Sequence, residues 1–127
     1  MSKCPFCDLE EARIVSSSSA AFAIRDSFPL TEGHTLVIPR AHVKSLYDLS
    51  VEDQSAVWNL VSKVRQNIKE QCGVHAFNIG INDGSDAGQT IEHAHVHVIP
   101  RRAGDVLDAR GGIRNIIPAN ARYWEKD

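Results

Sequence analysis

The sequence predicts an α+β protein in which a mainly antiparallel sheet packs against one long helix. Three observations lead to this prediction. One long segment of the 127-residue chain has its apolar residues at helical spacing. Shorter apolar or alternating segments lie on both sides of it. The resulting order is strand, strand, helix, strand, strand, with pairing between distant segments, which is typical of the α+β class.

Two segments in the N-terminal third are predicted to be strands. Residues 20–25 and 35–39 are short, rich in apolar residues and bounded by turn-forming residues. Residues 29–33, which include proline and glycine, are expected to form the loop between them. The four serines at 16–19 are expected to form a turn.

The clearest helix is predicted to begin after Ser50. Ser50 and Asp53 have the spacing of a capping-box variant. Gly73 is a suitable residue to end the helix, because glycine readily adopts the left-handed conformation needed there. The apolar residues between them fall on one face that we expect to be buried: Val57, Leu60, Val61, Val64 and Ile68.

Two further strands are predicted in the C-terminal half. Residues 77–81 alternate between apolar and polar, which indicates a half-buried strand. A turn-rich loop follows at 83–88. The next strand is expected at about 91–99, limited by Pro100. From residue 101 on, the chain is expected to be irregular.

Length and composition limit the class of protein. A chain of 127 residues fits one domain, which we expect to span residues 1–127 with a core at about 4–105 and an irregular arm at 106–127. With 14 basic and 16 acidic residues, a general nucleic-acid-binding surface is not expected. No apolar run approaches the ~20 residues of a membrane span, so no membrane partner is expected. The start of the sequence lacks a secretory pattern, and three cysteines fit a reducing, cytoplasmic setting.

The most informative feature is a row of three histidines at alternate positions, His93, His95 and His97. In a strand, alternate residues share a face, so the three imidazoles would lie side by side. Ala94, Val96 and Val98 would then point into the core. Imidazole titrates near neutral pH and can act as a nucleophile, a base or a metal ligand.

Three interpretations of this row are open. It is a polar strand face, a metal site, or a nucleophilic centre acting at phosphorus. The third needs one neutral imidazole with an available lone pair, and hydrogen-bond donors around the phosphoryl oxygens. Gly88-Gln89-Thr90 lies directly upstream and favours it, because the Gln89 amide can donate without adding charge. The alternative for Gln89 is a loop residue that makes a turn hydrogen bond.

Three segments together resemble the histidine triad (HIT) family of nucleotide hydrolases and transferases. The run at 87–101 resembles its signature, which is His-φ-His-φ-His-φ-φ with φ apolar. The run at 33–42 and Asn78-Ile79-Gly80 also resemble the family, and the resemblance covers about residues 4–105. It implies a HIT-like fold and a two-fold homodimer paired through the long helix and the adjacent strand.

The resemblance also implies roles for individual residues. His95 matches the nucleophile that attacks the α-phosphorus. His97 and Gln89 match residues that contact the phosphate and the leaving group. Asp26, His34 and Asn82 fall at positions near the substrate. Asp26 is alternatively a turn residue, and His34 a residue that supports the site from behind.

A metal site is expected at the N-terminus. Cys4 and Cys7 have the spacing of half a zinc site, although such pairs also occur in redox motifs. Similarity to microbial family members implies that His42 and His93 complete it as a structural zinc site. The alternative is two cysteines without metal. No organic cofactor is expected.

The implied activity is attack on the α-phosphate of a diadenosine polyphosphate or a nucleoside phosphoramidate. A nucleotidyl-histidine would form and a nucleoside monophosphate would be released. Two other interpretations are a non-catalytic nucleotide-binding regulator or scaffold, and a metallohydrolase that uses the histidine row as ligands. The tail resembles that of diadenosine-polyphosphate-directed members, so Arg110 and Arg114 either contact additional phosphates or are surface charges on an ordered arm.

Overall fold

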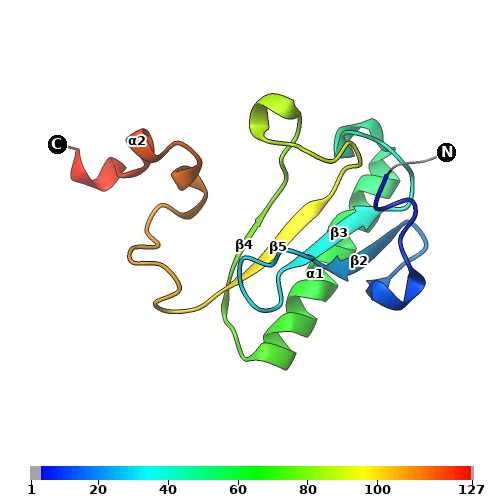
Figure 1. Cartoon of the computed structure of the whole chain (residues 1–127), viewed down its shortest axis with the longest axis horizontal. Coiled ribbons are helices and arrows are strands. Elements are labelled where there is room, and N and C mark those ends of the chain that lie inside the picture. The colour runs from blue at the N-terminus through cyan, green and yellow to red at the C-terminus, as the bar shows by residue number, and fades with distance from the viewer. Residues whose placement is uncertain (1–3, 127) are drawn as a thin grey trace.

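A five-stranded antiparallel sheet forms the centre of the protein. The computed structural model describes residues 4–126. The strands are β1 (Ile14–Ser17), β2 (Ala21–Arg25), β3 (Thr35–Pro39), β4 (Ala76–Gly80) and β5 (Val96–Arg101). Their spatial order is β1-β2-β3-β5-β4, and each neighbouring pair is antiparallel. With one main helix against this sheet, the predicted α+β class is confirmed (Figure 1).

The main helix, α1 (Val51–Cys72), matches its prediction closely. The Ser50 hydroxyl accepts a hydrogen bond from the backbone N–H of Asp53, which satisfies one of the exposed donors at the start of the helix. Gly73 ends the helix in the left-handed conformation, with φ 66°. All five apolar residues expected on the inner face are buried. They pack with buried residues of β2, β3 and β5 in the larger core cluster.

The edge strand β1 was not expected, because its serines suggested a turn. Ser16 and Ser17 pair with Ala23 and Phe22, and the turn is confined to the residues that follow. An edge strand has solvent on one side, so it can be short and polar without losing its main-chain pairing. This explains why a search for apolar alternation misses it.

The last strand also differs from its prediction. β5 begins at Val96, so His93 and His95 precede it, and it continues through Pro100 to Arg101. Pro100 pairs with Phe77 of β4, whereas the pairing of β5 with β3 reaches only to Val98. At Pro100 the strand therefore has a neighbour on one side only. A proline, which has no N–H to donate, is tolerated at such an edge.

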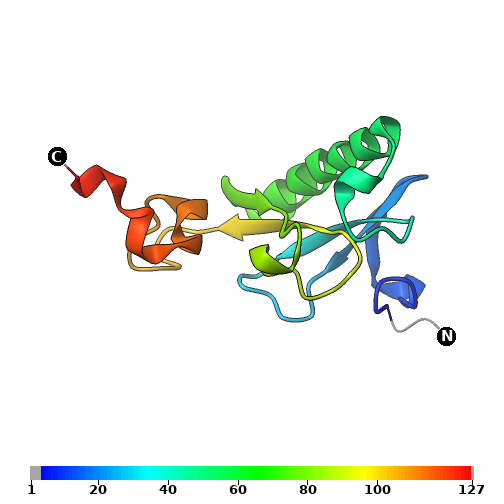
Figure 2. The same cartoon turned by 90° about the horizontal axis from the view of Figure 1, so that it is seen from above.

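The C-terminal segment extends away from the sheet. It contains short turns of helix at η4 (Gly112–Ile116), α2 (Pro118–Ala121) and η5 (Tyr123–Glu125). Both ribbon views show these turns beyond the ends of β4 and β5 (Figures 1 and 2). Short turns of helix also occur at η1 (Glu11–Arg13), η2 (Leu46–Asp48) and η3 (Ser85–Ala87). No helix within residues 4–126 combines the length and apolar character needed to cross a membrane.

Candidate active site and metal cluster

Two of the three histidines of the row, His95 and His97, lie side by side. The ring centroids of His95 and His97 are 5.2 Å apart, although only His97 belongs to β5. The intervening Ala94 and Val96 are buried in the core cluster under α1, as the alternation predicts. His93 is almost fully buried and faces the N-terminal cysteines. The row therefore contributes to two different sites.

Hydrogen bonding fixes the tautomer of His95. Its Nδ1 lies 2.8 Å from the backbone oxygen of His93. A carbonyl oxygen can only accept, so the proton of neutral His95 is on Nδ1 and the lone pair is on Nε2. This is the form in which an imidazole can act as a nucleophile.

His97 has the opposite tautomer, set by a chain of hydrogen bonds that begins at a backbone amide. The N–H of Leu30 donates to Nδ1 of His34 over 3.0 Å. Neutral His34 must therefore carry its proton on Nε2, which lies 3.0 Å from Nδ1 of His97. Nδ1 of His97 accepts this bond, so the proton of His97 is on Nε2. The site thus presents one Nε2 lone pair and one Nε2–H on adjacent rings.

Burial favours the neutral forms of His34 and His97, because desolvation lowers the pKa of each. Desolvation lowers the pKa of His97 to about 4, and the nearby rings of His95 and His34 act in the same direction. Desolvation also lowers the pKa of His34, although the Asp26 carboxylate opposes this. The Asp26 carboxylate lies 3.4 Å from Nε2 of His34 and also accepts the N–H of Phe28. Asp26 thus both contacts His34 and accepts a hydrogen bond within its own turn.

Asp26, His34 and His97 also have the composition of a metal site, with their ligand atoms within 4.8 Å of one another. The hydrogen-bond pattern argues against this use. A metal ligand needs a lone pair on the coordinating nitrogen, but the Leu30 N–H already occupies Nδ1 of His34. Nε2 of neutral His34 then carries the proton. At this cluster the geometry therefore favours hydrogen bonding over metal binding.

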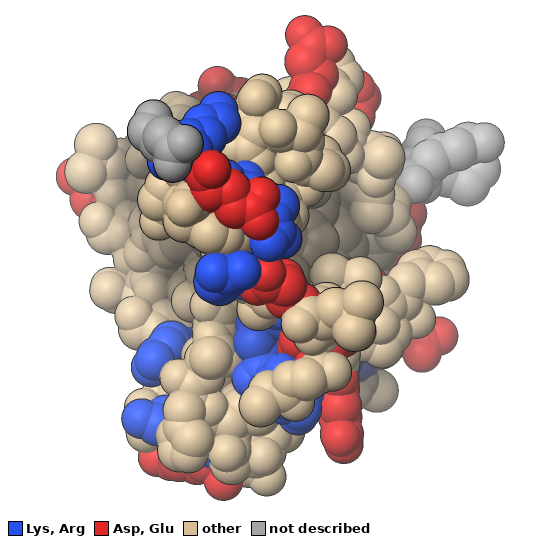
Figure 3. Space-filling view, turned by 90° about the vertical axis from the view of Figure 1, so that its left-hand side faces the viewer, with Lys and Arg blue, Asp and Glu red and all other residues tan. Residues whose placement is uncertain are grey.

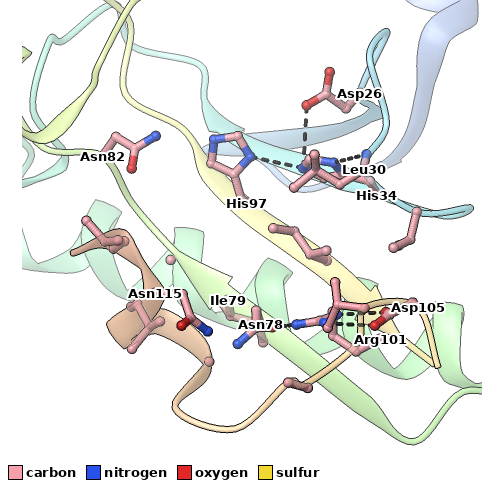
Figure 4. A pocket seen from close by; sticks show the side chains of 18 of the residues that line it. Asp26, Leu30, His34, Asn78, Ile79, Asn82, His97, Arg101, Asp105 and Asn115 are labelled. Carbon is pink, nitrogen blue, oxygen red and sulfur yellow. Dashed lines mark hydrogen bonds and ion pairs between the residues drawn. The ribbon is translucent and has the colours of Figure 1, made fainter. Parts of the chain in front are cut away.

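A cavity of about 910 Å³ opens beside these residues. At one end it is lined by Asp26, His34, Asn82 and His97 (Figure 4). From there it runs along β4 and β5 to the C-terminal segment. His95 is 9% exposed and is not among the described residues that line the cavity. Its ring contacts that of His97, which does line the cavity.

The Gln89 side chain makes three hydrogen bonds within the protein. Its side-chain oxygen accepts the N–H of Gly84, and its amide nitrogen donates to the backbone oxygens of Lys44 and Ile91. Both amide hydrogens are therefore used within the protein. Gln89 braces the loop before the histidines, as the alternative interpretation held. A direct contact with phosphate stays a prediction.

The four residues expected to bind metal converge at the other end of the histidine row. The ligand atoms of Cys4, Cys7, His42 and His93 all lie within 4.8 Å of one another. Nδ1 of His93 lies 3.3 Å from the Cys4 sulfur and 3.6 Å from the Cys7 sulfur. Nδ1 of His42 lies 3.1 Å from the Cys7 sulfur. Ligands of one tetrahedral zinc ion are themselves roughly 3.3–3.8 Å apart, so these distances fit such an ion.

The orientation of His93 also suits a metal ligand. Its Nε2 lies 2.8 Å from the backbone oxygen of Pro39, to which it must donate. This leaves the lone pair on Nδ1, facing the cysteines. A ligand histidine commonly donates its second N–H to a carbonyl in this way, which fixes both its tautomer and its orientation.

The arginines of the C-terminal segment are occupied within that segment. Arg110 pairs with Asp108, and Arg114 donates to the backbone oxygens of Asn120 and Ala121. Lys and Arg side chains lie among Asp and Glu side chains on this face of the molecule (Figure 3). The interpretation of Arg110 and Arg114 as parts of an ordered arm therefore fits the geometry better than phosphate contacts do.

Reasoning from the sequence missed two contributors to the site. Phe6 packs against both His93 and His95, with ring centroids 5.7 and 5.2 Å away. Its position between the two cysteines was the signal that could have drawn attention to it. The other is Leu30, which acts through its backbone N–H, and no residue type reveals such a role.

Comparison with known proteins identifies close relatives of the chain. Residues 9–104 match the HIT domain family. The chain is 46% identical over 87 residues to the asymmetrical bis(5'-nucleosyl)-tetraphosphatase of Schizosaccharomyces pombe, covering 68% of this chain and 47% of that protein. It is 35% identical over 97 residues to the AP-4-A phosphorylase of Mycobacterium tuberculosis, covering 76% of this chain and 50% of that protein. The chain thus spans about half the length of these two relatives.

A solved structure is similar over a larger share of both chains. It is a zinc-bound histidine triad family protein from Mycobacterium smegmatis, with a TM-score of 0.75 and 35% identity. The match covers 84% of this chain and 80% of that one. The fold and the order of its elements therefore recur in a protein that binds zinc.

Proposed function

The chain belongs to the HIT domain family, and we propose that it is a nucleotide hydrolase or nucleotidyl transferase acting at an α-phosphate. The relatives named for tetraphosphatase and phosphorylase activity support this reaction class. Its substrates would be diadenosine polyphosphates or nucleoside phosphoramidates, and its product a nucleoside monophosphate. The observation that carries the proposal is the opposite hydrogen-bonding character of His95 and His97.

In the first step, the Nε2 lone pair of His95 attacks the α-phosphorus and forms a P–N bond. The bond to the leaving group breaks, and the leaving atom keeps the electron pair. A phosphate leaves as an anion, and an amine takes a proton from solvent. The Nε2–H of His97 donates a hydrogen bond to the oxygens that gain negative charge. The bond from Nδ1 of His95 to the His93 oxygen stabilises the positive charge that forms on the His95 ring.

In the second step, water attacks the phosphorus of the nucleotidyl-histidine. The P–N bond breaks, its electron pair returns to Nε2 of His95, and the proton of water goes to solvent. The nucleoside monophosphate leaves. Asp26 and Asn82, which line the same cavity as His97, would hold the nucleotide during both steps.

The test is to trap the intermediate. The protein is mixed with diadenosine tetraphosphate, quenched in base within the first turnover, and analysed by mass spectrometry of its peptides. We expect one added nucleotidyl group on the peptide that contains His95. Rapid turnover with an adduct on another residue, or with no adduct at any time, contradicts the mechanism.

We also propose that Cys4, Cys7, His42 and His93 hold a structural zinc ion. The spacing of their ligand atoms and the zinc-bound relative support this proposal. Zinc would supply folding energy by joining the N-terminal turn to β3 and to the segment before β5. Metal analysis of the purified protein should find one zinc ion per chain.

A homodimer is part of the same proposal. β4 lies at an edge of the sheet, and Trp58 on α1 is 41% exposed. An unpaired strand edge and an exposed tryptophan suit contact with a second copy. Light scattering should give twice the chain mass, and Trp58→Glu should reduce it to one chain.

A further inference from the structure

A second, smaller cavity of about 280 Å³ lies between the edge strand β1 and the helix α1. Its lining residues come from three elements, and they are Val15 and Ser16 of β1, Arg25 of β2, and Val64, Asn67 and Gln71 of α1. The volume is just below the ~300–1,000 Å³ range of pockets for drug-sized ligands. A space of this size therefore suits a small ion better than a nucleotide.

The sheet separates this cavity from the candidate active site. Arg25 lies on the same face of β2 as Ala23, which packs with α1 in the larger core cluster. His97 lies between Val96 and Val98, which belong to that cluster as well, so His97 is on the opposite face of the sheet. None of the described residues lines both cavities. A ligand beside Arg25 would therefore not overlap a substrate beside His97.

Arg25 brings a positive charge into the smaller cavity. Its guanidinium donates to the Thr35 hydroxyl and to the side-chain oxygen of Gln71, and both of these acceptors are neutral. Within residues 4–126 it forms no ion pair with a carboxylate. The side chain is half-buried, so solvent screens its charge less than that of an exposed arginine. The chain itself thus leaves this charge without a counter-ion.

The other polar side chains of this cavity can all donate hydrogen bonds. The Asn67 amide and the Ser16 hydroxyl are half-buried, and neither has a side-chain partner within the part of the chain that the structure describes. The Gln71 oxygen already accepts from Arg25, which leaves the amide N–H groups of Gln71 as donors. No Asp or Glu is among the described residues that line the cavity. One cation with neutral donors and no carboxylate is a composition that favours an anion.

We propose that this cavity binds a small oxyanion, such as inorganic phosphate, and that the bound ion joins β1 to α1. A guanidinium matches phosphate oxygens well, and Arg25 has more N–H donors than its two bonds use. The other oxygens of the ion accept from Ser16 on the strand and from Asn67 and Gln71 on the helix. β1 has no strand on its outer side, so a bridge to α1 protects it from local opening. This binding does not depend on the reaction proposed at His95.

Titration with inorganic phosphate at constant ionic strength, followed by NMR, tests the site. The side-chain signals of Arg25, Asn67 and Gln71 should shift together and give one Kd. The signals of His97 are followed in the same titration, because a nucleotide site also suits phosphate. Shifts at His97 without shifts in the smaller cavity overturn the inference, and so does the absence of any shift at tens of millimolar phosphate.

Two variants remove the site in different ways. Arg25→Gln removes the charge and should raise the Kd for phosphate at least about tenfold, as the loss of charge-assisted hydrogen bonds implies. Asn67→Asp keeps the size of the side chain but places a carboxylate in the cavity, and it should raise the Kd by a similar factor. Its Tm in phosphate-free buffer should equal or exceed that of the wild type, because Arg25 gains a counter-ion. A folding defect would then not explain its loss of binding.

Lys63→Gln is the matched control. Lys63 lies on α1 one turn before Asn67, is exposed and is not among the described residues that line the cavity. The control removes the same charge as Arg25→Gln, but its Kd should stay within about twofold of the wild-type value. Equal increases in the two variants would show that only the net charge matters, which overturns the site.

The bridge between β1 and α1 has its own readout. Phosphate should raise the Tm and slow the hydrogen exchange of the β1 amides in the wild type and in Lys63→Gln. Both effects should be lost in Arg25→Gln and Asn67→Asp. Phosphate binding at Arg25 without slower exchange in β1 overturns the bridge.

Discussion

The Phe6 ring packs edge-on against the imidazole of His95, with ring centroids 5.2 Å apart and ring planes at 70°. Phe6 lies between Cys4 and Cys7, so the turn that carries two of the proposed metal ligands also touches the proposed nucleophile. His95 also contacts the His97 ring, with ring centroids again 5.2 Å apart. A ring that packs against two others has little freedom to rotate away from an attacking orientation.

We therefore expect Phe6→Leu to lower kcat about tenfold while KM changes less than twofold, because the variant frees the His95 ring without touching the cavity. Phe22→Leu is the matched control. Phe22 lies in the same core cluster and is equally buried, but it is not among the described ring partners of His95. Steady-state kinetics and zinc content should be measured for both. Equal kcat values in the two variants would show that the Phe6 contact is only packing.

His95→Ala should abolish turnover and leave the fold intact. The side chain lies at the margin of the core, at 9% exposure, and its loss removes the nucleophile. We expect kcat to fall at least about 10³-fold, while circular dichroism and cooperative unfolding remain like those of the wild type. If the variant keeps most of its rate on a nucleotide substrate, the assignment of His95 as the nucleophile is wrong.

Stability should decrease as the pH falls from 7 to 5, in part because of His97. In the folded state its pKa is lowered to about 4, whereas in the unfolded chain it is near 6.5. Between pH 4 and pH 6.5 the unfolded state therefore binds more protons than the folded state. The stabilising contribution of neutral His97 is fully present above pH 6.5 and is lost as the pH falls toward 4.

His97→Gln should reduce this loss by about 1 kcal/mol between pH 7 and pH 5, after allowance for the partial exposure of the ring. Urea unfolding at the two pH values measures the difference. Burial also lowers the pKa values of His34 and His93, so the variant should retain part of the pH dependence. An identical pH dependence in wild type and variant would contradict the lowered pKa of His97.

Removal of metal should destabilise the protein more than it slows the reaction. Cys7→Ala removes one of the four proposed zinc ligands. We expect it to lower Tm by several degrees and to abolish the further loss that a chelator causes in the wild type. Cys72→Ala, in which a cysteine outside the cluster is replaced, is the control. Equal Tm values for metal-free and metal-loaded wild type would rule out a structural ion.

Much of the fold follows from local sequence signals, and α1 shows why. Its start, its end and its buried face depend on residues within the helix or next to it, such as Ser50 and Gly73. The ends of β5 depend on distant partners instead. Ala94, two residues before the strand, donates its N–H to Val43, and Pro100 is tolerated because β3 has already ended.

The candidate site likewise contains some residues whose role the sequence indicates and others whose role depends on distant partners. The spacing of Cys4 and Cys7 suggested half of a metal site, and the resemblance to the family implied that His42 and His93 complete it. Gln89 has a suitable residue type for binding phosphate, but its partners include Lys44, which is 45 residues away in sequence. Only the folded chain shows that its amide is already used.

Position 30 combines two functions that can change independently. The main chain of Leu30 directs the proton on His34 and, through it, the proton on His97. The side chain of the same residue forms part of the cavity wall. Any amino acid except proline supplies that amide, so the cavity wall can be re-shaped at this position without reversing the hydrogen-bond polarity of His34 and His97. Position 30 is therefore a suitable place to begin engineering substrate preference.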